Sequence, residues 1–151
     1  MKEINELESM PFNEEAENSI LGSILIDGEK SFNKIQPWIR SNKAFYSLNN
    51  KHIWKAIKLL IQKKEPIDLI TISNQLKEEK IDGLFYYLSG LEDSVPTTSN
   101  VEYYAKIVWE KYVQREIRTT SQKMYNISFD KYEKTNSLIN DHLKWLEELR
   151  D

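Results

Sequence analysis

A long helical pattern near the carboxyl end of the sequence limits the possible folds more than any other feature. Across residues 100–127, apolar side chains recur every three or four positions, which is the period of an α-helix. Ser99 and Glu102 have the Ser-x-x-Glu spacing of a capping box, which marks a helix start. No segment of useful length alternates with the period of two that is typical of a strand. The sequence therefore predicts an all-α protein.

This long helix carries apolar residues on two faces. The first face holds Val101, Tyr104, Ala105, Val108 and Tyr112. The second face holds Tyr103, Ile107, Trp109, Val113 and Ile117. A helix on the surface of a globular protein needs only one apolar stripe. Two stripes indicate either contact with a partner beyond the chain's own core or burial of the helix at the centre of a bundle, and the pattern leaves both open.

Shorter helices are expected in the first two thirds of the chain. Asn13 can cap the first of them, and Asn49 and Asp68 can cap two more. A further short helix is predicted over residues 84–91. Residues 31–48 are predicted to be irregular, with one or two short turns. Core positions are expected within that stretch at Phe32, Ile35, Trp38, Ile39, Phe45 and Tyr46.

The end of the chain is expected to form an antiparallel helical hairpin with the long helix. A polar turn around residues 130–136 reverses the chain, and a last helix follows. Its inward residues are predicted to be Ile139, Leu143, Leu146 and Leu149. The predicted architecture is a small helical globular head followed by a long antiparallel helical hairpin. We divide this single structural domain into a flexible lead over residues 1–10, the head over 11–98 and the hairpin over 99–151.

Sequence motifs for catalysis are missing. The stretch Gly22–Ser31 resembles a phosphate-binding loop, but the predicted helix contains Gly22, and Glu29 would put negative charge beside any phosphate. His52 and His142 have no metal-ligand spacing around them, and the chain has no cysteine. We therefore expect no catalytic residue, no cofactor and no metal site in this chain.

The charge and hydropathy of the chain bear on its partners. The net charge of −3 and the pI of about 5.5 do not favour a nucleic-acid-binding domain. Lys51, Lys55, Lys58 and Lys63 mostly fall off the apolar stripe of their helix and are interpreted as a solvated face. No run approaches the roughly 18 apolar residues that span a bilayer, and the first ten residues lack a signal-peptide core. We expect a cytoplasmic protein without membrane contact.

Three blocks of the sequence are similar, in content, order and spacing, to a known family. They are "MPFNEEAENSILGSILID" at residues 10–27, "AFYSLNNKHIWKAIKLLIQKKEPIDLITISNQL" at 44–76 and "DGLFYYLSGLEDSVPTTSNVEYYAKIVWEKYVQREI" at 82–117. The most specific part is "SVPTTSNVEYYAKIV". The sequence resembles the amino-terminal domain of DnaB-type replicative DNA helicases.

The resemblance implies an assembly role in DNA replication without catalysis in this chain. The full-length protein would be an ATP-dependent DNA helicase, whose RecA-like motor domain is absent from these 151 residues. In the family, amino-terminal domains pair through their hairpins, and these dimers build a collar on a hexameric ring. The collar receives the carboxy-terminal domain of primase, and DNA is contacted only through the motor. We therefore expect a homo-oligomer that docks primase.

The long helix would supply the interface with a second copy or another partner. The candidate interface residues are Tyr103, Tyr104, Ile107, Val108, Trp109, Tyr112, Val113 and Ile117. Two alternatives remain beside this interpretation. A free-standing helical nucleic-acid-binding module would use the lysines at 51, 55, 58, 63 and 64. An ATPase would use Gly28–Ser31.

Overall fold

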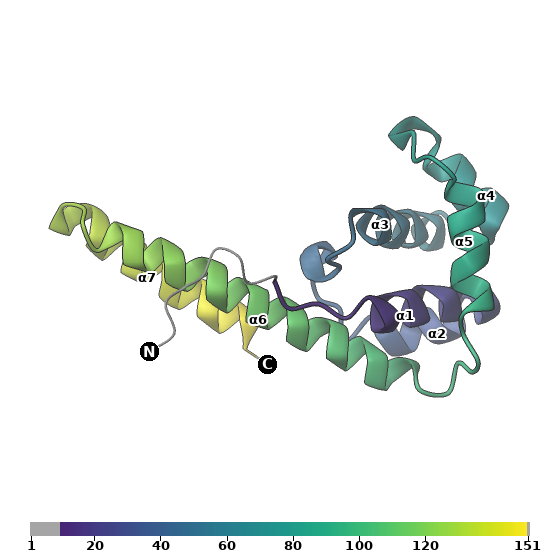
Figure 1. The fold of residues 1–151 in the computed structure, drawn as a ribbon, viewed down its shortest axis with the longest axis horizontal. Coiled ribbons are helices and arrows are strands. Elements are labelled where there is room, and N and C mark those ends of the chain that lie inside the picture. The colour runs from purple at the N-terminus through teal and green to yellow at the C-terminus, as the bar shows by residue number, and fades with distance from the viewer. Residues whose placement is uncertain (1–9, 151) are drawn as a thin grey trace. The chain divides into compact units, whose positions relative to one another are not determined.

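The computed structural model describes residues 10–150, so the expected flexible lead lies outside the described residues except for Met10. Helices make up all the regular structure of that range, which confirms the all-α fold class (Figure 1). The α-helices are α1 (Glu14–Asp27), α2 (Glu29–Ile35), α3 (Leu48–Gln62), α4 (Leu69–Gln75), α5 (Leu84–Asp93), α6 (Val101–Ile127) and α7 (Tyr132–Leu149). Two short 3-10 helices are η1 (Asn42–Ala44) and η2 (Lys77–Glu79).

The chain forms two compact units. The first, which we call the head, comprises residues 12–112 and includes the beginning of α6. The second, which we call the hairpin, contains the rest of α6 and all of α7. The boundary between the units therefore lies inside α6, whereas the sequence analysis places it between residues 98 and 99.

Side-chain caps start several helices as the sequence suggests. Asn13 Oδ1 accepts the Ala16 N–H at 2.9 Å, and Asp68 and Thr71 form a reciprocal capping box at the start of α4. Helix α3 differs, because its cap is Ser47, whose Oγ accepts the Asn50 N–H at 3.3 Å. The expected cap Asn49 therefore lies inside the helix.

The region expected to be irregular contains an additional helix. Gly28 adopts φ 63, which ends α1 and lets α2 begin one residue later. Asp27 Oδ1 accepts the Ser31 N–H at 3.0 Å and so satisfies one of the exposed amides at the start of α2. Phe32 and Ile35 are buried as expected. The prediction missed this helix because its local signal is only seven residues long.

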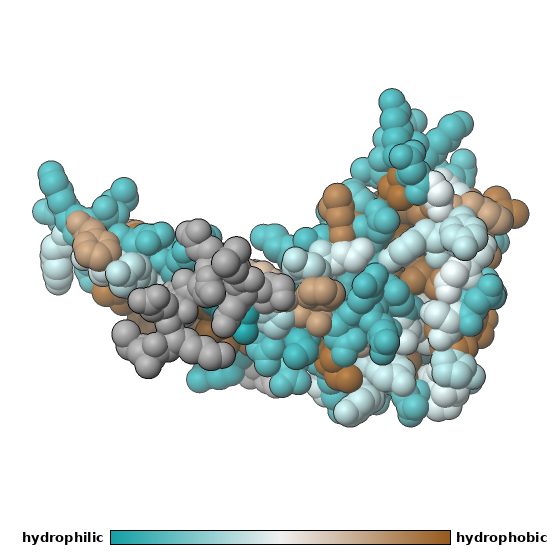
Figure 2. Space-filling view, in the orientation of Figure 1, coloured by the Kyte–Doolittle hydropathy of each residue, from teal (hydrophilic) through white to brown (hydrophobic). Residues whose placement is uncertain are grey.

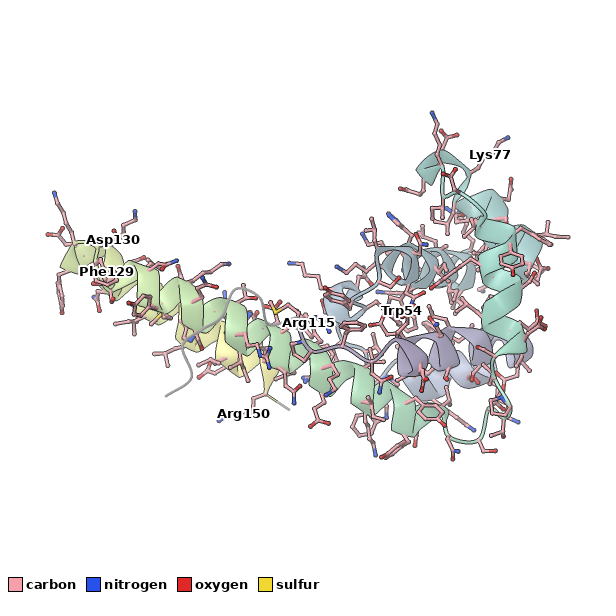
Figure 3. The ribbon with its side chains drawn as sticks, viewed as in Figure 1. Trp54, Lys77, Arg115, Phe129, Asp130 and Arg150 are labelled. Atoms are coloured by element: carbon pink, nitrogen blue, oxygen red, sulfur yellow. The ribbon has the colours of Figure 1, made fainter. Side chains whose placement is uncertain are left out.

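The aromatic core of the head gathers around Trp54 (Figure 3). The Trp54 ring lies 5.3 Å from the ring of Phe32 and 5.5 Å from that of Phe45. Two residues expected in this core are elsewhere. Trp38 is half-buried, and Tyr46 is exposed, with its ring stacked on Phe12 at 4.5 Å.

A buried carboxylate connects α1 to the start of α3. Glu17 is 2% exposed, and its Oε2 accepts the Tyr46 N–H at 2.9 Å. Its Oε1 accepts the Ser47 N–H at 3.3 Å and a side-chain N–H of Asn50 at 3.2 Å. The negative charge lies at the amino-terminal end of α3, where backbone N–H groups and the helix dipole stabilise an anion.

Asn50 extends this network to α5. Its Nδ2 also donates to Asn18 Oδ1 at 3.1 Å, and its Oδ1 accepts the Tyr87 hydroxyl at 2.6 Å. Burial raises the pKa of Tyr87 above its ordinary value of 10.0, and the negative charges of Glu14 and Glu17 act in the same direction. Burial therefore favours the neutral phenol, and the hydrogen-bond network joins helices α1, α3 and α5.

Helices α1 and α5 approach each other closely at Gly22. A Cβ atom at this position would collide with the Leu91 carbonyl oxygen and with Cγ2 of Val95. Backbone atoms cannot move aside as a flexible side chain can, so only glycine permits this packing. Gly22 therefore serves helix packing, and its backbone is part of α1 rather than of a loop.

Gly22→Ala should lower the free energy of unfolding by about 1–3 kcal/mol, because the added methyl group overpacks the α1–α5 contact. Gly90→Ala is the matched control, since its Cβ would meet no atom within 4 Å and alanine is the better helix former. Chemical denaturation measures both. Equal stability of Gly22→Ala and the original chain would contradict the close approach.

Stability should fall as pH rises above about 10, because the unfolded chain ionises Tyr87 more readily than the folded chain does. Tyr87→Phe should be less stable near neutral pH by about 0.5–1.5 kcal/mol through the lost hydrogen bond. Between pH 9 and 11 the free energy of unfolding should fall less for Tyr87→Phe than for the original chain, so the difference in stability between the two should become smaller. Tyr86→Phe, at an 86% exposed position, should leave the pH profile unchanged.

Candidate partner-binding surface

The first apolar face of α6 closes the head. Val101, Ala105, Val108 and Tyr112 are all buried within their own chain. This result corrects two of the candidate interface residues, because Val108 and Tyr112 are only 2% and 7% exposed and have little surface left for a partner. Tyr104, on the same face, is half-buried.

The second apolar face of α6 is partly engaged by the head. The Arg40 guanidinium lies 4.7 Å from the centre of the Trp109 ring, and the Tyr112 ring is 5.0 Å away. In the same way, the Lys106 ammonium lies 4.4 Å from the Trp38 ring. These cation–π contacts hold the loop after α2 against α6. Trp109 is consequently half-buried and makes contacts inside its own chain.

The remaining candidate residues differ in exposure. Tyr103 and Ile117 are exposed, whereas Ile107 and Val113 are half-buried. The surface of α6 that is available to a partner is therefore narrower than the sequence analysis expects.

Helix α7 packs against the second part of α6 through a mixed apolar and polar face. A groove of about 190 Å³ lies between the two helices. From α6 it is lined by Glu116, Thr120, Lys123, Met124 and Ile127, and from α7 by Leu138, Asp141, His142 and Trp145. The His142 and Trp145 rings stack at 5.2 Å. Neither a group of metal-binding side chains nor a helix able to span a membrane occurs in residues 10–150.

The predicted inward face of α7 is wrong at three of its four positions. Ile139, Leu143 and Leu146 are 46%, 56% and 39% exposed, while Leu149 is half-buried. The helix has apolar or aromatic side chains at neighbouring positions, such as 138 with 139 and 145 with 146, so two adjacent stripes compete for the inside. The stripe that contains Trp145 faces the groove. We call the exposed residues Ile139, Leu143 and Leu146 the α7 stripe.

Large apolar side chains are also exposed near the turn of the hairpin. Tyr125, Phe129 and Tyr132 are more than half exposed, and the Tyr125 and Phe129 rings contact each other at 5.5 Å. Phe129 and Asp130 lie at the end of the hairpin in Figure 3. Figure 2 shows hydrophobic side chains among hydrophilic ones on the visible face of this unit. These residues are not among the candidates predicted from the sequence, although three aromatic residues within eight positions of a polar region were a usable signal.

Within the hairpin unit, Arg115 fixes the approach of the chain to α6. Arg115 is buried, and its Nη1 donates to the Pro11 carbonyl oxygen at 2.9 Å. A hydrogen bond from a charged donor is stronger than one between neutral groups. This contact holds the segment before α1 against α6 at Pro11, close to the beginning of the hairpin, where Figure 3 labels Arg115.

The geometry of Gly22–Ser31 differs from that of a phosphate-binding loop. Such a loop presents free N–H groups at the start of a helix. Here Gly22 lies within α1, and the Asp27 carboxylate already accepts the Ser31 N–H. A second anion at that amide would be repelled by Asp27.

Comparisons with known proteins agree with this architecture. The family model for the DnaB-like helicase N terminal domain matches residues 9–110. The replicative DNA helicase DnaB of Buchnera aphidicola subsp. Baizongia pistaciae is 36% identical over 137 residues, which cover 89% of this chain and 29% of that protein. The replicative DNA helicase DnaC of Bacillus subtilis is 30% identical over 143 residues, covering 92% of this chain and 31% of that protein.

Solved structures share the fold. The N-terminal domain of DnaB helicase from Mycobacterium tuberculosis superposes with a TM-score of 0.80 at 24% identity, covering 90% of this chain and 99% of that one. A DnaB-like replicative helicase, solved in a study of its interactions with primase, superposes with a TM-score of 0.66 at 24% identity. The match covers 91% of this chain and 32% of that one. The chain is an all-α domain with a helical hairpin, and it belongs to the DnaB-like helicase N-terminal domain family. It spans about a third of the length of the curated relatives it matches.

Trp109→Ala should destabilise folding by about 2 kcal/mol, less than a fully buried tryptophan, because the ring is half-buried beneath Arg40. Self-association should change little, since the ring contacts its own chain. Thermal unfolding and sedimentation of the same variant measure the two effects. A loss of self-association with unchanged stability would contradict the packing of Trp109 within its own chain and would indicate that Trp109 contacts a partner.

Proposed function

We propose that this chain is the amino-terminal collar domain of a hexameric replicative DNA helicase, and that it pairs with a second copy through its hairpin. It performs no catalysis itself and uses no cofactor, and a motor domain in the same longer protein hydrolyses ATP. The length of the relatives supports this division, because the chain matches about a third of each. The family to which the chain belongs supports the role in DNA replication.

The observation that carries the pairing proposal is the exposed apolar surface of the hairpin. The α7 stripe places Ile139, Leu143 and Leu146 on one side of α7 at spacings of four and three residues, and all three are exposed. Helices pack against one another through stripes with this spacing. Contiguous exposed apolar residues of this kind mark interaction sites in proteins that are otherwise polar outside.

The proposed pairing surface combines the α7 stripe with Ile117, the exposed α6 residue of the hairpin unit among the interface candidates predicted from the sequence. Ile117 lies on the part of α6 that belongs to the hairpin unit, and Val113, one helical turn before it, is half-buried. Aromatic residues near the turn, Tyr125 and Phe129, add area of the type that anchors protein interfaces. Three other candidates lie in the head unit and remain candidates for other contacts: the exposed Tyr103 and the half-buried Tyr104 and Ile107.

We further propose that the assembled collar receives the carboxy-terminal domain of primase. The support is a structural relative, a DnaB-like replicative helicase whose interactions with primase were studied. Residues exposed on a pair of packed helices can present such a partner with a preformed surface, which reduces the entropy lost on binding.

Replacing both Ile139 and Leu143 by serine should weaken self-association at least about 100-fold, since each buried aliphatic side chain contributes about 1.5–3 kcal/mol. The folding of the head should not change, because both residues are exposed on α7. Analytical ultracentrifugation over a range of concentrations measures the dissociation constant.

The control variant is Ile70→Ser, which removes an apolar side chain that is 73% exposed on α4 in the head. It should leave the dissociation constant unchanged. A chain that stays monomeric at the highest concentration, or a control that dissociates as much as the double variant, would contradict pairing through the hairpin.

A further inference from the structure

Positive charge is concentrated in one part of this acidic chain. Residues 30–64 contain nine of the 21 lysines and arginines and none of the 24 aspartates and glutamates. This stretch therefore carries a charge of +9 in a protein whose total is −3, which leaves −12 for the rest. The net charge of the whole chain conceals this separation, which runs from α2 through the end of α3.

The structure brings several of these lysines together on the outer side of α3. Lys51, Lys55 and Lys58 follow one another at spacings of four and three residues. Lys55 is exposed, whereas Lys51 and Lys58 are half-buried at the edge of the buried face, three residues before and four residues after Trp54. Successive lysines are thus about 4.5–6 Å apart along the helix axis. Lys43 on η1 is exposed next to them, since Lys58 Nζ donates to the neighbouring Asn42 Oδ1 at 3.2 Å. We call Lys43, Lys51, Lys55 and Lys58 the α3 basic face.

The surroundings of this face leave its charge available. The bonds formed by Lys58 and Lys63 go to the neutral amides of Asn42 and Gln75, at 3.2 and 3.4 Å, so these contacts do not neutralise the ammonium groups. Of the acidic residues in contact with α3, Glu79 lies 3.7 Å from His52, and the carboxylate of Glu17 accepts N–H groups of Ser47 and Asn50. The α3 helix itself contains no carboxylate.

We propose that the α3 basic face binds the phosphate backbone of single-stranded DNA. The choice of DNA rests on the proposed function in a replicative helicase; the charge and geometry rest on the structure alone. Lysines neutralise phosphates and release condensed counterions, which makes such binding favourable and strongly salt-dependent. A row of lysines, exposed at Lys43 and Lys55 and half-buried at Lys51 and Lys58, contacts phosphates rather than base edges and so predicts binding that is independent of sequence. This site differs from the expectation that DNA is contacted only through the motor domain.

The binding test uses the full chain with a fluorescent oligo(dT) of about 30 nucleotides, long enough to cover the face. Fluorescence anisotropy is measured over a range of NaCl concentrations. Three or four phosphate contacts predict that log K falls with log salt concentration at a slope of about −2 to −3. Absence of binding at the lowest salt concentration would overturn the proposal.

The variant Lys43→Gln, Lys51→Gln, Lys55→Gln should weaken binding at least about tenfold at low salt and reduce the slope by about two. Its matched control, Lys77→Gln, Lys131→Gln, Lys144→Gln, removes the same charge at exposed positions outside the face and should retain affinity within about twofold. Equal losses of oligonucleotide affinity in the variant and in the control would show that net charge alone attracts the DNA, and would overturn the proposed site.

Polyglutamate of similar length is the competitor that separates nucleic acid from an acidic protein partner. Failure of polyglutamate to displace the oligonucleotide supports DNA, and displacement at equal charge concentration overturns the choice of DNA. Sedimentation of the same lysine variant should show unchanged self-association, because the α3 basic face is in the head unit. A chain that pairs through its hairpin but does not bind DNA overturns only this inference and leaves the collar assignment intact.

Discussion

The fold of the head depends on one buried anion, the carboxylate of Glu17. Its two oxygens receive the backbone N–H groups of Tyr46 and Ser47 and a side-chain N–H of Asn50. A buried carboxylate is costly unless such donors replace its water, so the start of α3 can occupy only one position relative to α1. Through Asn50 the same network reaches Tyr87 on α5.

The hairpin is stabilised differently from the head. The head closes its core with the first apolar face of α6, and its buried aliphatic and aromatic side chains are covered by their own chain. The hairpin instead combines a groove that contains polar side chains with an outer α7 stripe that is left exposed. Apolar surface left in water gives a second copy a favourable free energy of association. The head therefore covers its own apolar core, whereas the hairpin leaves apolar side chains exposed.

The sequence predicts the long helix, the caps at Asn13 and Asp68 and the all-α class, because these signals are local and strong. It misses α2, whose start depends on the positive φ of Gly28. It also assigns the wrong inner face to α7, because adjacent apolar stripes have equal periodicity and only packing against α6 decides between them. Whether Trp109 meets a partner could not be predicted either, since the covering Arg40 is distant in sequence.

Amide hydrogen exchange across α7, measured as a function of protein concentration, tests the central claim most directly. If a second copy covers the α7 stripe, exchange of residues 132–149 should slow progressively as the concentration rises through the dissociation constant. Exchange in α3, which lies in the head, should stay constant over the same range. Exchange in α7 that is identical at all concentrations would contradict pairing through the hairpin.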